Sequence, residues 1–235
     1  MTVSKIFRGH EIWLEPTRTH FHKGELVKVK VGWGHALRTD GPGEKEKWTP
    51  YMITPSGEKL MLPVVDSEGE YFLLLFRAEE KGSYTVVVEN NYGVGTKLRD
   101  GSFHRGPKKD YDNVERTFYF YQYAKTCIPI GHSKELPERA GNELEITPLN
   151  LGSDNLELEV AHKGKPLPEA VLEGTSNRHD GFTVKTTTDK LGRAEISVDK
   201  PTWMFRVHYF DKKGLEGLYD QIRLTATYTI IMEGI

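Results

Sequence analysis

Hydrophobic and polar residues alternate along most of this chain. In segment 25–35 (ELVKVKVGWGH), Val27, Val29 and Val31 share one parity, while lysines occupy the other. An alternation of period two predicts a strand with one buried face. Further segments rich in β-branched and aromatic residues also predict strands: 71–78, 83–90, 116–130, 155–164, 182–188, 193–198, 202–210 and 226–232. Because no long amphipathic helical pattern accompanies them, the sequence predicts an all-β protein.

A polar segment over 131–143 (GHSKELPERAGNE) separates two blocks of predicted strands. Its glycines and Pro137 are typical of a domain boundary. We therefore expect two antiparallel β-sandwich domains, over 1–135 and 140–235. The hairpin-rich pattern of the second block resembles small transthyretin-like sandwiches, with Gly192 in a turn that needs a positive φ.

Composition narrows the classes of function. The 235 residues carry a formal net charge of −2, so no overall field attracts nucleic acid or an anionic membrane. No apolar run is long enough for a transmembrane helix. The first residues (MTVSKIFRGHEIW) lack the apolar core of a signal peptide, so we expect either a cytosolic protein or a chain without its leader. A single cysteine, Cys127, excludes an intrachain disulfide and any metal site that needs several thiolates.

Catalytic motifs are missing from the sequence. It contains no phosphate-binding loop, no dinucleotide-binding glycine pattern, no nucleophile elbow and no HExxH zinc motif. We expect a protein that is not an enzyme. A hydrolase stays open as an alternative, because triads are assembled from residues far apart in sequence.

Histidines are the residues most suited to binding chemistry, and the chain has nine of them. His10 shares parity with Ile12 and Leu14, and His35 ends the inward row of segment 25–35. Gly32 and Gly34 leave room for a close approach of backbone or ligand beside His35. We therefore expect His10 and His35 to face a pocket at one end of the first domain.

These observations predict a divalent transition-metal site. We expect His10 and His35 as ligands, with His104 of the glycine-rich segment GSFHRG as the third donor. Neutral imidazoles bind nickel, cobalt, zinc and copper, and a site without thiolates suits reversible capture. Asp40 and Glu11 are near enough in sequence to add an oxygen ligand. Glu11 ranks lower because strand alternation points its side chain away from that of His10.

Other interpretations stay open. His20 and His22 lie two apart in a predicted strand, so they share a face at about 6–7 Å and offer a competing chelate. His10 and His35 also fit core or rim positions with a hydrogen bond to the backbone. The pair His20 and His22 fits an exposed polar face beside a turn, and His104 fits a solvated loop. Cys127 fits a small buried side chain. The row Tyr119, Tyr121 and Tyr123 fits either a carbohydrate platform or a face covered by the neighbouring domain.

The order and spacing of several motifs carry a family resemblance over nearly the whole chain. The motifs are GHEIWLEP, KGELVKVKVGWGHALRTDG, YAKTCIPIG, LEITPLN, TTDKLGRAEISV and TWMFRVHYF. Together they resemble the NikM-like family, extracytoplasmic proteins associated with cobalt and nickel uptake. His10 and His35 lie within the first two of these motifs.

The resemblance implies a periplasmic or extracellular location and a role in metal uptake. It favours nickel or cobalt, with zinc and copper as further candidates. It also implies a membrane metal-transport complex as partner, with membrane contact only through that partner or through an anchor outside this sequence. The alternative function is a carbohydrate- or protein-binding β-sandwich module without a metal.

Overall fold

The computed structural model describes residues 10–131, 133, 135–150, 155–198 and 202–231. Within these residues the protein is built almost entirely from strands, which confirms the predicted all-β class. Two single turns of 3-10 helix, η2 (Lys45–Lys47) and η3 (Lys108–Asp110), interrupt the strands. None of the described helices is long and apolar enough to cross a membrane.

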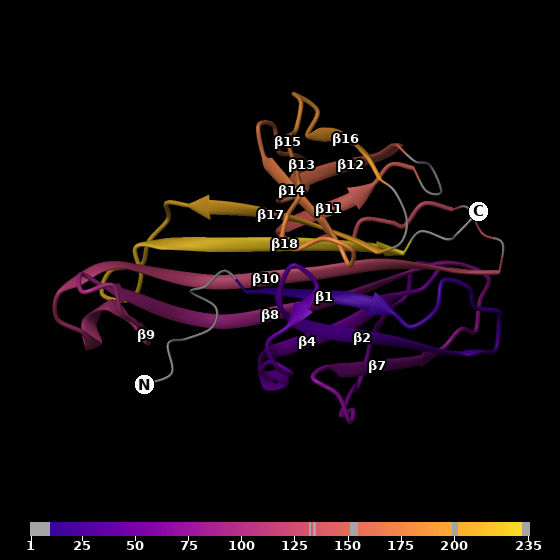
Figure 1. The fold of residues 1–235 in the computed structure, drawn as a ribbon, viewed down its shortest axis with the longest axis horizontal. Helices are drawn as coiled ribbons and strands as arrows, with labels where there is room; N and C mark the ends of the chain where they lie inside the picture. Colours follow the sequence, from indigo (N-terminus) through magenta and orange to yellow (C-terminus); the bar gives the residue numbers. More distant parts are fainter. Residues whose placement is uncertain (1–9, 132, 134, 151–154, 199–201, 232–235) are drawn as a thin grey trace.

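The strands form three sheets. The first sheet contains β1 (Glu11–Pro16), β2 (Leu26–His35), β3 (Arg38–Thr39), β6 (Val64–Val65) and β7 (Phe72–Arg77). The third contains β11 (Leu144–Pro148), β12 (Asn155–His162), β13 (Lys165–Pro166) and β16 (Arg193–Ser197). Between them lies a central sheet, which both outer sheets share as a packing partner (Figure 1).

The central sheet has nine strands from both halves of the sequence. They are β4 (Trp48–Ile53), β5 (Lys59–Met61), β8 (Gly82–Leu98), β9 (Phe103–Arg105), β10 (Val114–Ile130), β14 (Val171–Ser176), β15 (Val184–Thr187), β17 (Thr202–Asp211) and β18 (Gln221–Ile231). Their order is β15-β14-β17-β18-β10-β8-β4-β5, with β9 beside β8. All pairings are antiparallel except β10 with β18, which is parallel and joins the two halves of the chain. Within 1–135 and within 140–235 the strands pair antiparallel, as predicted, and the parallel pairing joins the two ranges.

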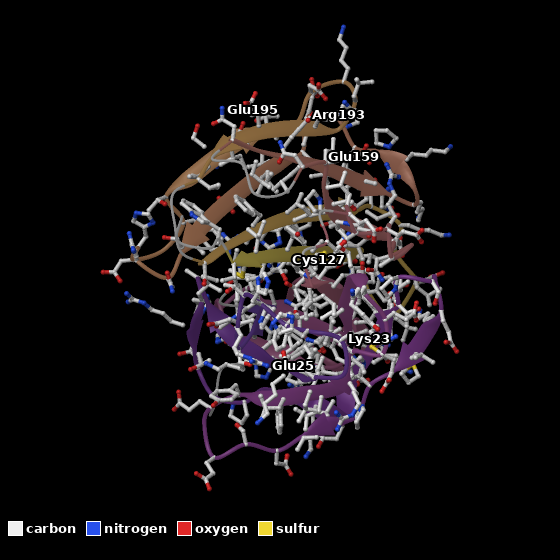
Figure 2. All side chains as sticks on the ribbon, turned by 90° about the vertical axis from the view of Figure 1, so that its right-hand side faces the viewer. Lys23, Glu25, Cys127, Glu159, Arg193 and Glu195 are labelled. Carbon is white, nitrogen blue, oxygen red and sulfur yellow. The ribbon has the colours of Figure 1, made fainter. Side chains whose placement is uncertain are left out.

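Opposite faces of the central sheet bury two hydrophobic clusters. Phe120 and Ala124 of β10 belong to the cluster under the first sheet, whereas Tyr123 belongs to the cluster under the third. Because side chains alternate along a strand, one strand serves both cores. Side chains fill both layers in the end-on view, where Cys127 lies near the middle (Figure 2).

We call the first sheet, together with the hydrophobic cluster beneath it, the first lobe. We call the third sheet, together with β14, β15, β17 and β18 of the central sheet, the second lobe. The division of the chain into domains 1–135 and 140–235 stays a prediction, since strands of both ranges share the central sheet. That each folds independently stays a prediction, as does the transthyretin-like character of the second. The turn expected at Gly192 is present, with φ at 72°. A Cβ there would lie 2.6 Å from the Val160 carbonyl oxygen, so only glycine fits without a shift.

Candidate metal centre

Pairing of β1 with β2 brings two of the predicted ligands together. Glu11 lies opposite Gly34 in the antiparallel register, which places the preceding residue, His10, next to His35. The centroids of the two imidazole rings are 4.1 Å apart. The juxtaposition that parity indicated is therefore present at one end of the first lobe.

A tight turn after β2 adds the third donor. β3 folds back on β2 with His35 opposite Arg38, leaving only Ala36 and Leu37 in the loop. Both have positive φ values, 48° and 65°, as a two-residue hairpin of the type I′ class requires. The chain then delivers Asp40 to the histidines, and its amide donates to the Trp33 carbonyl at 2.9 Å.

The donor atoms of these three residues converge. The Oδ2 atom of Asp40 lies 2.8 Å from Nε2 of His10, a hydrogen bond whose proton a metal ion would replace, and 3.9 Å from Nε2 of His35. All three donors lie within 4.8 Å of one another. Ligands about 2.1 Å from a common ion are separated by roughly 3–3.5 Å, so shifts below 1 Å suffice for coordination. Two imidazoles and a carboxylate at this spacing fit a divalent transition metal.

Exposure is graded across the group. The side chain of His10 is 1% exposed, whereas those of His35 and Asp40 are 39% and 48% exposed. His10 is therefore buried, whereas the other two donors are partly exposed to solvent. An ion would reach the outer donors directly from solvent.

Packing around His10 fixes the orientation of its side chain. Its ring stacks on Trp33 with centroids 5.4 Å apart, and Trp33 stacks in turn on Tyr92. The side-chain amide of Gln122 on β10 donates to the His10 carbonyl at 2.7 Å. A Cβ at Gly34 would lie 2.0 Å from the Arg38 carbonyl oxygen, so this glycine is needed for the β2–β3 hairpin. The central sheet and the hairpin together orient the ligands.

Glu11 points away from the donor group, as alternation predicted. Its fully buried carboxylate accepts a hydrogen bond from the Ala36 amide at 3.2 Å and pairs with Arg206 of β17. Burial raises the pKa of Glu11, and the charge of Arg206 opposes that rise. Glu11 thus supports the turn beside His35 and is not placed as a ligand.

The prediction of His104 as third donor is not supported, because the fold holds it elsewhere. His104 pairs with Thr96 on β8, which is opposite Thr117 on β10, whereas His10 lies against Gln122 of β10. Five residues of strand correspond to about 16 Å. The His104 ring instead bonds Ser102 at 3.0 Å and packs on Tyr111. Asp40 occupies the role given to His104, and only its nearness to His35 in sequence signalled this.

The other histidines that the structure describes do not join the group. The strand predicted around His20 and His22 is wrong, because both lie between β1 and β2. Their ring centroids are 5.8 Å apart, but no third donor of the described residues joins them. His208 is enclosed on β17 and bonds Thr225 at 2.9 Å. Burial, then repulsion from Arg223 and Arg206, lowers the pKa of His208 well below its usual value, so it stays neutral. His132 lies outside the described residues.

The surroundings of Cys127 and of the row Tyr119, Tyr121 and Tyr123 indicate packing roles and not ligand binding. Burial raises the pKa of the Cys127 thiol to about 11, which disfavours the thiolate that a metal would need. Tyr123 belongs to the second hydrophobic cluster, and Tyr121 packs against it. The hydroxyls of Tyr119 and Tyr121 donate to Asn91 and Glu89. This arrangement favours the covered-face interpretation of the row.

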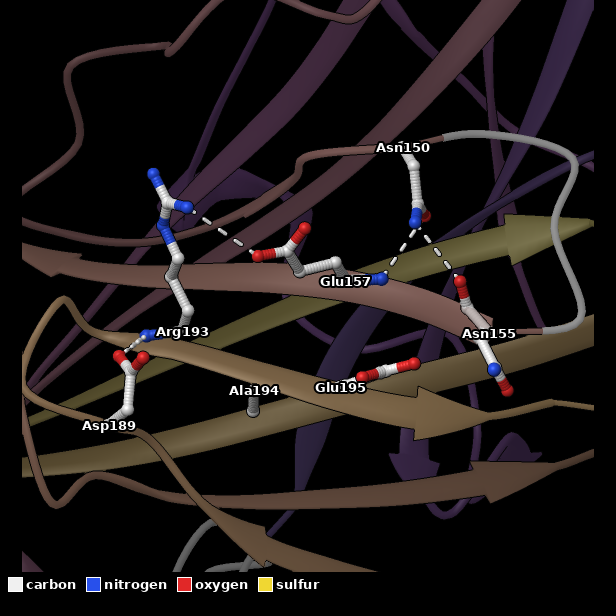
Figure 3. Close-up of a pocket in the computed structure, with 7 residues that line it drawn as sticks. All are labelled: Asn150, Asn155, Glu157, Asp189, Arg193, Ala194 and Glu195. Carbon is white, nitrogen blue, oxygen red and sulfur yellow. Dashed lines mark hydrogen bonds and ion pairs between the residues drawn. The ribbon is translucent and has the colours of Figure 1, made fainter.

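A separate shallow pocket of about 520 Å³ opens on the third sheet (Figure 3). Its lining is polar and comprises Asn150, Asn155, Glu157, Asp189, Arg193, Ala194 and Glu195. Asp189 accepts backbone hydrogen bonds from Leu191 and Arg193, which stabilise the turn before β16. The polar groups mainly bond one another, and they form no converging set of metal donors among the described residues.

Comparison with solved structures finds only distant likeness. A DUF4785 family protein from Legionella pneumophila is 8% identical with a TM-score of 0.28, covering 83% of this chain and 50% of that one. The D0-D1 domain of intimin is 9% identical with a TM-score of 0.26, covering 93% and 97%. The fibronectin(III)-like modules of Clostridium thermocellum CbhA are 7% identical with a TM-score of 0.20, covering 92% and 94%. This chain thus spans half the length of the Legionella protein, and TM-scores this low carry no argument.

Comparison of the sequence with known families assigns the chain to a family, which the solved structures do not. No curated protein matches the chain. A family model, described as a domain of unknown function (DUF4198), matches residues 7–211, which is well over half of the chain and includes all three converging donors. The chain therefore belongs to the DUF4198 family.

Proposed function

We propose that this protein binds a divalent transition metal through His10, His35 and Asp40, as an extracytoplasmic component of metal uptake. One observation carries the proposal: three donors from β1, β2 and the following hairpin lie within 4.8 Å of one another. In this proposal the protein captures the metal ion as cargo and performs no catalysis.

The donor set indicates the class of ion. Imidazole suits nickel, cobalt, copper and zinc, and the carboxylate adds a harder oxygen. Calcium and magnesium prefer all-oxygen sites, so they fit this set poorly. The preference for nickel or cobalt over zinc or copper rests on the resemblance to NikM-like proteins.

Graded exposure supports capture that is reversible. With three protein donors, positions remain for water or for a donor from another molecule. Since His35 and Asp40 are partly exposed to solvent, an ion could be exchanged through them without opening the core. Permanent structural sites are usually closed by four protein ligands.

The cellular setting rests on the same resemblance. NikM-like proteins are associated with cobalt and nickel uptake outside the cytoplasm. By analogy we propose a periplasmic or extracellular location and a membrane metal-transport complex as the receiver of the ion. The charge of −2 gives no reason to expect nucleic acid as a partner.

Isothermal titration calorimetry with Ni²⁺ and Co²⁺ tests the proposal on protein purified without a histidine tag. We expect one ion per chain, with affinity in the micromolar range or tighter. The His10→Ala and His35→Ala variants should each lose roughly 100-fold or more in affinity, about 2.7 kcal/mol.

A His20→Ala/His22→Ala variant is the matched control, because it removes two neighbouring imidazoles outside the site. We expect it to bind as tightly as the wild type. Wild-type affinity no tighter than about millimolar, roughly −4 kcal/mol, would refute the metal proposal and favour a carbohydrate- or protein-binding module.

A further inference from the structure

The hairpin that carries His35 has an unfavourable sequence for its geometry. Two-residue loops with positive φ at both positions favour Asn-Gly or Asp-Gly, yet this loop is Ala36-Leu37. Left-handed conformations are strained for such residues and persist where the surroundings enforce them. Something next to this turn must therefore hold it.

Glu11 supplies that hold. Its Oε2 accepts from the Ala36 amide at 3.2 Å, in a buried hydrogen bond between β1 and the turn. Ala36 directly follows His35, so the position of the Glu11 carboxylate affects the direction in which the imidazole points. The side chain of Glu11 is fully buried.

Glu11 is in turn fixed by the second lobe. Its other oxygen, Oε1, pairs with Nη1 of Arg206 on β17. The same guanidinium donates from Nε and Nη2 to Glu173 of β14, at 2.9 and 2.8 Å. It also lies over the Phe182 ring, 3.6 Å from the ring centroid. Arg206 is thus clamped within the second lobe and reaches one carboxylate of the first.

We propose that Arg206 is a positioning residue for the metal centre: it fixes Glu11, Glu11 holds the Ala36–Leu37 turn, and the turn aims His35. Metal affinity then depends on contact between the lobes, although every ligand belongs to the first. This inference rests on the proposed function. Residues behind metal ligands typically change affinity 10- to 100-fold when they are replaced.

A measurement without metal tests the structural half of the inference. Hydrogen exchange of the Ala36 amide, followed by NMR, reports directly on its bond to Glu11. We expect the Ala36 amide to exchange faster in Arg206→Met. We expect the same in Glu173→Gln, a variant that weakens the hold on Arg206 while leaving Glu11 in place. Unchanged exchange in both variants would overturn the inference.

Calorimetry with Ni²⁺ tests the functional half. We expect Arg206→Met to bind roughly tenfold more weakly than wild type. Glu11→Gln keeps an oxygen that accepts from the Ala36 amide, so it should bind more tightly than Glu11→Leu. In a His35→Ala background, Arg206→Met should have no further effect, because it acts through His35. A full additional loss in that background would contradict the inference.

Arg139→Met is the matched control, since it removes another arginine–carboxylate pair of the second lobe, that with Glu159. It should leave both Ala36 exchange and Ni²⁺ affinity unchanged. Circular dichroism confirms which variants are folded, and Glu173→Gln decides the outcome if Arg206→Met does not fold. If the wild type binds Ni²⁺ and the folded Arg206→Met and Glu173→Gln variants bind it equally tightly, this inference is refuted and the proposed function is not. Absent wild-type binding refutes the proposed function, while the exchange data still decide whether Arg206 holds the turn.

Discussion

Comparison of two clusters of ionisable side chains shows that they differ in how far solvent can reach them. In the first, Lys125 of β10 donates to Glu145 at 2.5 Å and to Thr147 at 2.8 Å, both on β11. The backbone amides of Ala140 and Gly141 complete the shell of the Glu145 carboxylate. Both charged side chains are almost fully buried, 3% and 4% exposed.

The second cluster, His10, His35 and Asp40, passes from buried to exposed within a few ångströms. Its members carry lone pairs that suit a metal, whereas the first cluster consists of a cation already paired with an anion. The contrast teaches that burial of charge alone does not indicate a binding site. The buried pair of Lys125 and Glu145 connects β10 with β11, whereas the partly exposed donors His10, His35 and Asp40 can receive an ion.

Breaking the closed pair should have the largest effect. Lys125→Ala leaves the Glu145 carboxylate buried without its cation, and we expect the free energy of unfolding to fall by about 3–5 kcal/mol. Burial already lowers the pKa of Lys125, while Glu145 opposes that shift. Urea denaturation followed by circular dichroism measures the loss.

The double variant Lys125→Met/Glu145→Leu serves as its control, because it removes both charges and keeps apolar volume. It should be close to wild type in stability. A loss below about 1 kcal/mol in Lys125→Ala would show that water reaches the pair and that the cluster is not closed.

Changes in the open cluster should affect ion binding more than stability. Asp40→Ala removes an exposed donor and its hydrogen bond to His10, so we expect roughly tenfold to 100-fold weaker Ni²⁺ binding and a loss of about 1 kcal/mol in unfolding free energy. His104→Ala should bind as wild type, because His104 belongs to β9 and not to the centre. Calorimetry and urea denaturation of both variants check this; weaker binding by His104→Ala would restore it as a ligand.

His208 extends the comparison to a histidine in closed surroundings. Its pKa is lowered in the folded protein, so the unfolded chain binds the extra proton below about pH 6.5. Its contribution to stability is therefore complete above that pH and is lost as the pH falls, by at most about 1.4 kcal/mol per pH unit. His208→Gln should flatten the fall in unfolding free energy between pH 6.5 and 5. An identical slope in variant and wild type would contradict the closed environment.

The smallest effect concerns the strained hairpin. Leu37→Gly replaces a residue at φ 65° with one that adopts this conformation freely. We expect the variant to be more stable by about 0.5 kcal/mol, since part of the gain is offset by the flexibility of glycine in the unfolded chain. Thermal denaturation measures the difference. Destabilisation by more than about 1 kcal/mol would mean that the Leu37 side chain, and not its backbone, decides this position.

Local patterns in the sequence predicted much of the fold. Alternation of Val27, Val29 and Val31 correctly predicted the buried face of β2, and the aromatic run over 116–130 correctly predicted most of β10. The parallel pairing of β10 with β18 could not be predicted, because the partners are separated by about a hundred residues and no local pattern encodes which strands become neighbours.

The candidate site was predictable where it depended on parity and proximity. His10 directly precedes β1, His35 ends the paired strand β2, and Asp40 follows His35 closely. His104 was misplaced because a glycine-rich segment indicates flexibility but not location. The link from Glu11 to Arg206 connects residues almost two hundred positions apart. Only the packing of β1 across the central sheet reveals it.

Anomalous X-ray diffraction at the nickel absorption edge, from crystals of the untagged protein grown with Ni²⁺, locates the bound ion. We predict one strong peak about 2.0–2.2 Å from Nε2 of His10, Nε2 of His35 and a carboxylate oxygen of Asp40. A peak at His20 and His22 instead, or no peak at a concentration that saturates calorimetric binding, would contradict it.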